Sequence, residues 1–171
     1  LRSLVPNVQF DVLREHGRSR DPSELGHVEV VGSLDEGLAR QPHMMVIANP
    51  SSMHLQPLLA AIDAGIPFYA EKPVVSTLDD LSLLQSRVVR GGLSPNVVGC
   101  NLRFLPSLIA LKALVDEGRL GNLVRADFEA GQWLPDWRPS QDYRLGYSAK
   151  RSQGGGVLLD LIHEVDAALW L

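Results

Sequence analysis

Residues 44–73 read MMVIANPSSMHLQPLLAAIDAGIPFYAEKP, and this stretch decides the fold. Its first part, residues 44–48, is continuously apolar, which is typical of a strand buried on both faces of a parallel sheet. Residues 54–64 have the apolar spacing of a helix that ends at Gly65, and residues 67–70 predict a second strand. A strand, a helix and a strand joined by short links predict a parallel sheet covered by helices.

The same alternation continues on both sides of this stretch. We expect strands at residues 8–13, 27–31 and 96–101, and helices at residues 34–40, capped by Ser33, and 77–89. After about residue 103 the pattern changes to a helix at 106–117, a long strand at 123–134, a polar and aromatic loop at 135–153 and an apolar helix after Gly154-Gly155-Gly156. We therefore expect two domains, residues 1–100 and 101–171.

Composition excludes several classes of protein. The 171 residues are 45% hydrophobic and 21% charged, with a net charge of −4, and no basic cluster could neutralise a run of phosphates, so we expect no nucleic-acid partner. No apolar run approaches the roughly 20 residues of a membrane helix. The single cysteine, Cys100, excludes an internal disulfide and favours a reducing compartment, so we expect a cytoplasmic protein.

Polar residues follow the strand at residues 44–48. Asn49, Pro50, Ser51 and His54 lie where that strand ends and a helix begins. Ligands bind beyond the carboxyl ends of strands in such sheets, and helix N-termini attract anions. A turn capped by serine, with a solvated histidine, is the alternative interpretation.

Glu71-Lys72-Pro73 follows the next strand. Proline disfavours helical geometry at Lys72, so the lysine is expected to be extended and to point out of the sheet edge. There its charge could hold a substrate hydroxyl or lower the pKa of that hydroxyl. A surface lysine in a loop is the alternative.

Asp160 and His163 are three residues apart in the last helix and therefore share one of its faces. Their neighbours are apolar, so both side chains must pair with each other or face a polar cavity. The three glycines before the helix allow another backbone or a ligand to approach closely. The H-E-x-x-H spacing of a zinc site is absent, and we expect no metal.

Two further groups of residues suggest ligand contacts. Trp137, Tyr143 and Arg144 in the long loop are typical of a pocket for a sugar or nucleotide sugar, or of the packed interior of the loop. Arg14, with Arg18 and Arg20, follows the first strand, where a dinucleotide-binding sheet meets the adenosine ribose. A solvated loop is the alternative for these arginines.

Together, the motifs resemble the glucose–fructose oxidoreductase/inositol dehydrogenase (Gfo/Idh/MocA) family. The matching features are an apolar strand with Pro50 and His54, a helix ending in Ala-x-x-Gly, Glu71-Lys72-Pro73, the glycine triplet, and Asp160 with His163, Asp166 and Trp170. Asn101-Leu102-Arg103-Phe104 and residues 134–139 resemble members found with surface-polysaccharide and sugar-modifying genes.

The resemblance implies an α/β fold: a Rossmann-type parallel sheet followed by an α/β domain with an open antiparallel sheet. It implies an enzyme that uses NAD or NADP to transfer a hydride to or from a sugar, nucleotide-sugar or cyclitol hydroxyl carbon, and a homo-oligomer at full length. Lys72 would orient and polarise the hydroxyl, His163 would accept its proton, and Asp160 would orient the substrate or the histidine.

The resemblance also assigns binding residues. The cofactor would be bound by Arg14, Asn49, Pro50, Ser51, His54, Glu71 and Lys72, with Pro50 and His54 on the nicotinamide side. The substrate would be bound by Arg103, Trp137, Tyr143, Arg144 and His163.

The chain departs from the family pattern in two ways. Asp160 and His163 are three residues apart rather than four, and no G-x-G-x-x-G is present. We therefore expect an internal fragment that lacks the first strand and the phosphate-binding glycines and is inactive alone. Two alternatives to a dehydrogenase are a glycosidase that retains NAD and a ligand-sensing, non-oxidising member of the scaffold. A flavodoxin-like signalling domain is a third.

Overall fold

The computed structural model describes residues 7–14, 28–91 and 95–171. Its contacts divide the chain into two compact units, Leu1–Met44 and Met45–Leu171, and each is described by itself. Arg18 and Arg20 lie outside the described residues. The expected domain boundary near residue 100 stays a prediction.

The first unit contains two parallel strands and one helix. Strand β1 (Phe10–Leu13) pairs with β2 (Val28–Val31), and helix α1 (Leu34–Ala39) follows. Ser33 caps α1, because its hydroxyl accepts a hydrogen bond from the backbone N–H of Glu36 at 3.1 Å. The two strands, the helix and its cap confirm the expectation for this part of the chain.

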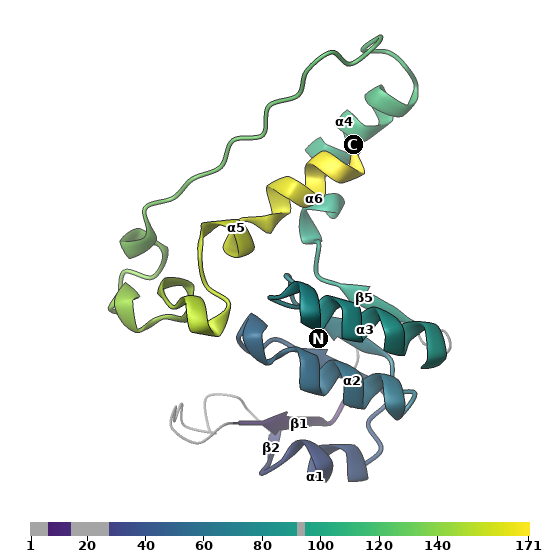
Figure 1. Cartoon of the computed structure of the whole chain (residues 1–171), viewed down its shortest axis with the longest axis vertical. Coiled ribbons are helices and arrows are strands. Elements are labelled where there is room, and N and C mark those ends of the chain that lie inside the picture. The colour runs from purple at the N-terminus through teal and green to yellow at the C-terminus, as the bar shows by residue number, and fades with distance from the viewer. Residues whose placement is uncertain (1–6, 15–27, 92–94) are drawn as a thin grey trace. The chain divides into compact units, whose positions relative to one another are not determined.

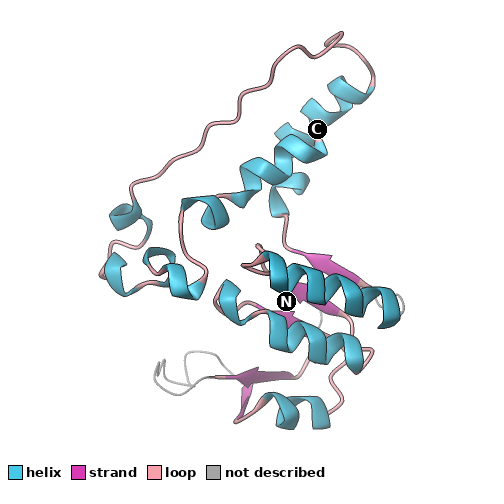
Figure 2. Cartoon of the chain, in the orientation of Figure 1, coloured by secondary structure: helices cyan, strands magenta, loops and turns pink. Residues whose placement is uncertain are grey.

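The second unit begins with a three-stranded parallel sheet. Its strands β3 (Met45–Ile47), β4 (Phe68–Ala70) and β5 (Asn96–Val98) lie in that order. Helices α2 (Leu55–Asp63) and α3 (Leu78–Gly91) pack side by side over the sheet (Figure 1, Figure 2). The parallel sheet with helical crossovers confirms the predicted α/β class.

The core of this unit lies between the sheet and its helices. Ile47 and Phe68 of the strands pack with Leu58 and Ala61 of α2 and with Leu84 of α3. Leu58 and Ala61 are fully buried, so α2 is held by its apolar face. The hydrophobic core therefore supports the edge of the sheet that Glu71 and Lys72 follow.

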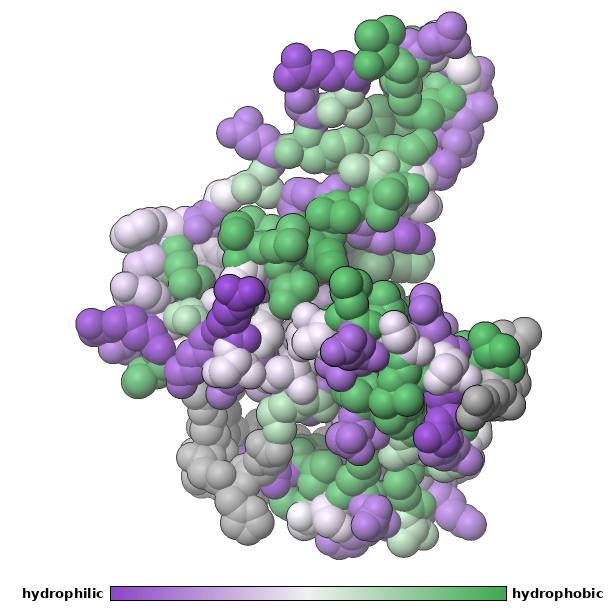
Figure 3. Space-filling view, in the orientation of Figure 1, coloured by the Kyte–Doolittle hydropathy of each residue, from purple (hydrophilic) through white to green (hydrophobic). Residues whose placement is uncertain are grey.

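The rest of the chain is helical or irregular. It contains η3 (Asn101–Phe104), α4 (Pro106–Asp116), η4 (Leu134–Trp137), η5 (Tyr143–Leu145), η6 (Tyr147–Ala149), η7 (Arg151–Gln153), α5 (Val157–Asp160) and α6 (Ile162–Trp170). Apolar side chains of α4 and α6 gather on the surface, where Ile109 and Leu169 are exposed (Figure 3). None of the described helices combines the length and the apolar character that crossing a membrane requires.

Two expectations for this region were wrong. Residues 123–134 form no strand, and Val124 is 96% exposed, because no other described strand lies beside them to complete a ladder. The last helix is not continuous but breaks at Leu161, whose φ and ψ are −101° and 30°.

Candidate active site

Glu71 and Lys72 leave the sheet at the carboxyl end of β4. The Tyr69 hydroxyl donates a hydrogen bond to Glu71 Oε1 at 3.0 Å. Burial, and then the Glu71 carboxylate, raise the pKa of Tyr69. A Cβ atom on Gly99, after β5, would overlap the Tyr69 hydroxyl, so the Tyr69 side chain would have to move. Glu71 is therefore held in place by its neighbours in the sheet.

Lys72 reaches the second predicted motif. Its ammonium donates a hydrogen bond to the backbone carbonyl of Asp160. That carbonyl is available because of the break at Leu161, where the N–H of Glu164 bonds to the Leu161 carbonyl at 3.3 Å. In an unbroken helix Glu164 would donate to Asp160 instead.

Asp160 is only 7% exposed. Its carboxylate accepts hydrogen bonds of 3.4 Å from the Ser148 hydroxyl and from the backbone N–H of Gly156. The side chain thus connects the loop before the glycines to the helix after them. A buried carboxylate with weak partners suits a residue that also binds a ligand.

His163 lies at the start of α6. Burial lowers the pKa of its imidazole, and the positive charge of Lys72 lowers it further, against the opposing effect of Glu164, Asp166 and Glu71. Its Nδ1 is buried without a hydrogen-bond partner among the described residues. A neutral imidazole beside a lysine ammonium can accept a proton from a bound hydroxyl group.

The turn after β3 is tightly held. The Asn49 side chain donates to the Met53 carbonyl at 3.1 Å, and Ser51 is 5% exposed. His54 is 1% exposed, and both of its ring nitrogens face backbone carbonyl oxygens. The expectation that His54 lines a cofactor pocket does not fit this placement, because the ring has almost no exposed surface and no free polar edge. Pro50 stays partly exposed beside it.

The glycine triplet allows the close approach expected of it. Gly154 has a φ of +82°, and a Cβ there would lie 2.9 Å from Ser51 Cβ and 3.1 Å from the Ser52 nitrogen. A Cβ on Gly155 would overlap the carbonyl oxygens of Tyr147 and Ser148. The loop that leads to Asp160 therefore packs directly on the turn after β3.

The side chain of Arg103 binds to α6. Its guanidinium donates two hydrogen bonds to the Asp166 carboxylate, 2.9 Å from Nε and 2.5 Å from a terminal nitrogen, and lies 5.9 Å from the Trp170 ring centroid. The Asp166 carboxylate, together with burial as the larger effect, raises the pKa of the Cys100 thiol. Arg103 thus anchors α6 to the segment after β5.

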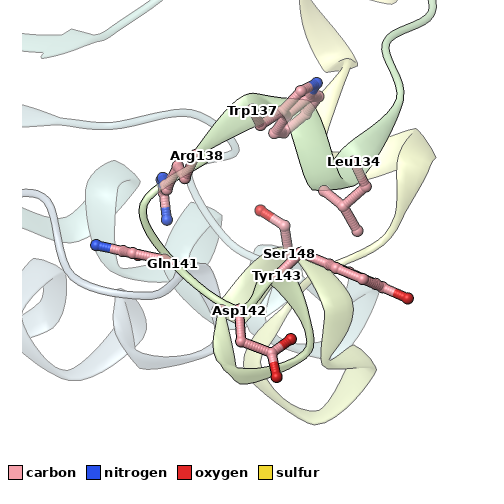
Figure 4. A pocket seen from close by; sticks show the side chains of 8 residues that line it. Leu134, Trp137, Arg138, Gln141, Asp142, Tyr143 and Ser148 are labelled. Atoms are coloured by element: carbon pink, nitrogen blue, oxygen red, sulfur yellow. The ribbon is translucent and has the colours of Figure 1, made fainter.

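The long loop folds into short 3₁₀ turns around a small hollow (Figure 4). Trp137 and Tyr143 line this hollow, whose volume of about 20 Å³ suits about one water molecule. Arg144 does not line it but pairs with Asp142 at 2.9 Å. The Trp137 indole nitrogen is buried without a partner among the described residues.

The structure gathers some predicted residues and separates others. Lys72, Asp160 and His163 come together, whereas the aromatic loop has its own hollow and Arg14 belongs to the first unit. Tyr69 and Ser148 are additions to the site. Tyr69 could have been found, because residues two apart in a strand share a face and Glu71 follows it by two. The described residues contain no group of side chains able to hold a metal ion.

Comparisons with known proteins agree with this architecture. The chain is 35% identical over 121 residues to oxidoreductase P35 of Formosa agariphila, covering 70% of this chain and 37% of the relative. It is 30% identical to inositol 2-dehydrogenase of Streptomyces avermitilis, and the aligned residues cover 86% of this chain and 38% of the relative. The apo scyllo-inositol dehydrogenase of Lactobacillus casei superimposes with a TM-score of 0.65 at 25% identity, over 86% of this chain and 41% of that one. The chain spans less than half the length of these proteins.

A family model matches the C-terminal part of the chain. Residues 108–171 match the GFO/IDH/MocA C-terminal domain. This match includes Asp160, His163 and the α6 helix, whereas Lys72 lies before it, directly after strand β4. The chain therefore belongs to the Gfo/Idh/MocA family.

Proposed function

We propose that the complete protein is an oxidoreductase that uses NAD or NADP to transfer a hydride to or from a hydroxyl-bearing carbon of a sugar, nucleotide sugar or cyclitol. One observation carries the proposal: the Lys72 ammonium donates a hydrogen bond to the backbone carbonyl of Asp160, three residues before His163, whose Nδ1 has no partner among the described residues. Relatives named as inositol dehydrogenases support the substrate class.

The chemistry of this edge fits a nicotinamide cofactor. Asn49 and Pro50 are accessible at the carboxyl end of β3, Glu71 and Lys72 follow β4, and the buried Nδ1 of His163 is a polar atom that a bound ligand could satisfy. When bound, the nicotinamide would supply the hydride acceptor or donor. Asn49, Pro50, Glu71 and Lys72 would hold it. The expectation that Arg14 contacts the adenosine ribose stays a prediction. Ser51 and His54 are buried, so they would support these residues without touching the cofactor.

Lys72 would bind the substrate hydroxyl, and His163 would accept its proton. An ammonium carries three N–H donors, and the Asp160 carbonyl takes one, so the others can hold the hydroxyl oxygen. The positive charge lowers the pKa of that hydroxyl. His163, kept neutral by burial and by Lys72, then accepts the proton.

Asp160 and the loop would place the rest of the substrate. The Asp160 carboxylate is connected through Ser148 to the loop that carries Trp137 and Tyr143. Aromatic rings and a carboxylate suit the apolar faces and hydroxyl groups of a carbohydrate. We extend the proposal to Arg103 and Arg144 as outer contacts, to a homo-oligomer and to a cytoplasmic location.

The test is an activity survey on the complete protein. NAD(H) and NADP(H) binding is measured first, and sugars and cyclitols are then screened for nicotinamide reduction. Lys72→Met and His163→Asn should each lower turnover by about 100-fold or more. His43→Asn, which changes an exposed histidine, should not. Lack of binding of either cofactor would refute the proposal, and release of free sugar from a glycoside without net oxidation would favour a glycosidase.

A further inference from the structure

Both ring nitrogens of the buried His54 face backbone carbonyl oxygens. Nε2 lies 2.9 Å from the Asn49 oxygen, and Nδ1 lies 3.0 Å from the Pro73 oxygen and 3.2 Å from the Val74 oxygen. Asn49 belongs to the turn after β3, whereas Pro73 and Val74 belong to the segment after β4. One imidazole therefore spans the loops that follow two neighbouring parallel strands.

The chemistry of these contacts gives His54 a holding role. A carbonyl oxygen only accepts hydrogen bonds, so any ring nitrogen that carries a proton donates to one of the two loops. With the proton on Nδ1 the ring donates to the segment after β4, and with the proton on Nε2 it donates to the turn after β3. Removing the ring would leave the carbonyl group that accepts its N–H without this buried donor, which costs free energy where water cannot reach that carbonyl.

The segment held by His54 contains Lys72. On one side of the lysine, the Glu71 N–H donates to the Ile47 carbonyl at 2.8 Å, which extends the pairing of β4 with β3. On the other side, the Pro73 carbonyl faces His54. The backbone is thus held both before and after Lys72, and only the second attachment comes from a side chain.

We propose that His54 is a positioning residue, which fixes the backbone after Lys72 and thereby sets the place of the Lys72 ammonium beside His163. The inference rests on the proposed function for its effect on turnover. Its effect on the distance between Lys72 and His163 does not depend on any cofactor.

The pKa of His163, measured by titration, depends on how far the Lys72 ammonium lies from its imidazole ring. Burial and the Lys72 charge lower its pKa, while Glu164, Asp166 and Glu71 act in the opposite direction. A displaced Lys72 ammonium would therefore let the His163 midpoint rise. The experiment follows the imidazole signals by NMR as a function of pH in the complete protein without cofactor.

The variants are His54→Phe, which keeps a ring but no nitrogen, and His54→Gln, which keeps a side chain that can donate hydrogen bonds. Lys72→Met gives the midpoint without the lysine charge, and His43→Phe repeats the first substitution at an exposed histidine. We expect the midpoint to rise in His54→Phe, to rise less in His54→Gln, and not to rise further when His54→Phe is added to Lys72→Met. His43→Phe should leave it unchanged.

Turnover supplies a second readout. If the dehydrogenase activity is present, kcat of His54→Phe should fall on the order of 10-fold to 100-fold, with a smaller change in the KM for the cofactor. Absence of activity in the unaltered protein would refute the proposed function but leave the titration decisive. A His54→Phe or His54→Gln variant that melts at lower temperature yet keeps the unaltered His163 midpoint would overturn the inference.

Discussion

The ammonium of Lys72 hydrogen bonds to the backbone carbonyl of Asp160, 88 residues further along the chain. The helix break at Leu161 leaves that carbonyl without the N–H of Glu164. A side chain from the sheet edge thus takes the place of an intrahelical donor. The contact brings the two motifs that carry the family resemblance into one site.

Replacing Lys72 with methionine tests this contact. Lys72→Met should lower the free energy of unfolding by about 2 kcal/mol, because the hydrogen bond from a charged group is lost. It should also abolish most turnover and raise the pKa of His163. Thermal melts, kinetics and NMR titration measure the three effects. Lys150→Met, a lysine of the loop, is the control, and equal losses in both variants would contradict a special role for Lys72.

His163 should make stability depend on pH in a defined direction. Because its folded pKa is lowered, the unfolded chain binds a proton at a higher pH than the folded one does. Stability should therefore decline as the pH falls below about 6.5, the ordinary value for histidine, towards the lower folded value. Chemical denaturation at several pH values should show this slope in the unaltered protein and a weaker slope in His163→Asn. An equal slope in both would contradict the prediction.

The local pattern of residues 44–73 is enough to predict the sheet and its helices, because apolar runs, caps and glycine stops act over a few residues. The break at Leu161 could not be predicted, since neither proline nor glycine marks it and it accompanies a bond from Lys72, far away in sequence. The prediction of a strand at residues 123–134 was wrong for a related reason. A strand requires a neighbouring strand to hydrogen bond with, in addition to an alternating sequence pattern. His54 was noticed, but its burial depends on segments after two separate strands.

Replacing Trp137 with phenylalanine should affect protein stability and substrate binding differently. Its indole nitrogen is buried without a partner among the described residues, so Trp137→Phe should cost little stability or even increase it, because an unsatisfied donor is removed. If the indole N–H binds a substrate hydroxyl, KM should rise about tenfold with kcat nearly unchanged. Trp133→Phe alters an exposed tryptophan and should change neither. A large loss of stability in Trp137→Phe would contradict the prediction.

Arg103 should act mainly through α6. Arg103→Lys cannot reproduce the two-pronged bond to Asp166, and we expect a loss of about 1 kcal/mol in the free energy of unfolding. Arg119→Lys alters an exposed pair with Glu117 at 3.9 Å and should have almost no effect. Urea unfolding compares the two. If Arg103→Lys raised the substrate KM strongly without any loss of stability, the arginine would contact substrate rather than anchor the helix.

Gly154 offers a test of how closely the loop packs on the turn after β3. Gly154→Ala should be more destabilising than Gly121→Ala, although both glycines have positive φ angles, +82° and +68°. The backbone strain is common to both, at about 1 kcal/mol. Only at Gly154 does the new methyl group meet Ser51 and Ser52, which adds on the order of 1–3 kcal/mol. Because Asp160 follows the same loop, Gly154→Ala should also lower turnover, whereas Gly121→Ala should not. Equal melting temperatures for the two variants would mean that the loop does not pack on the turn in solution.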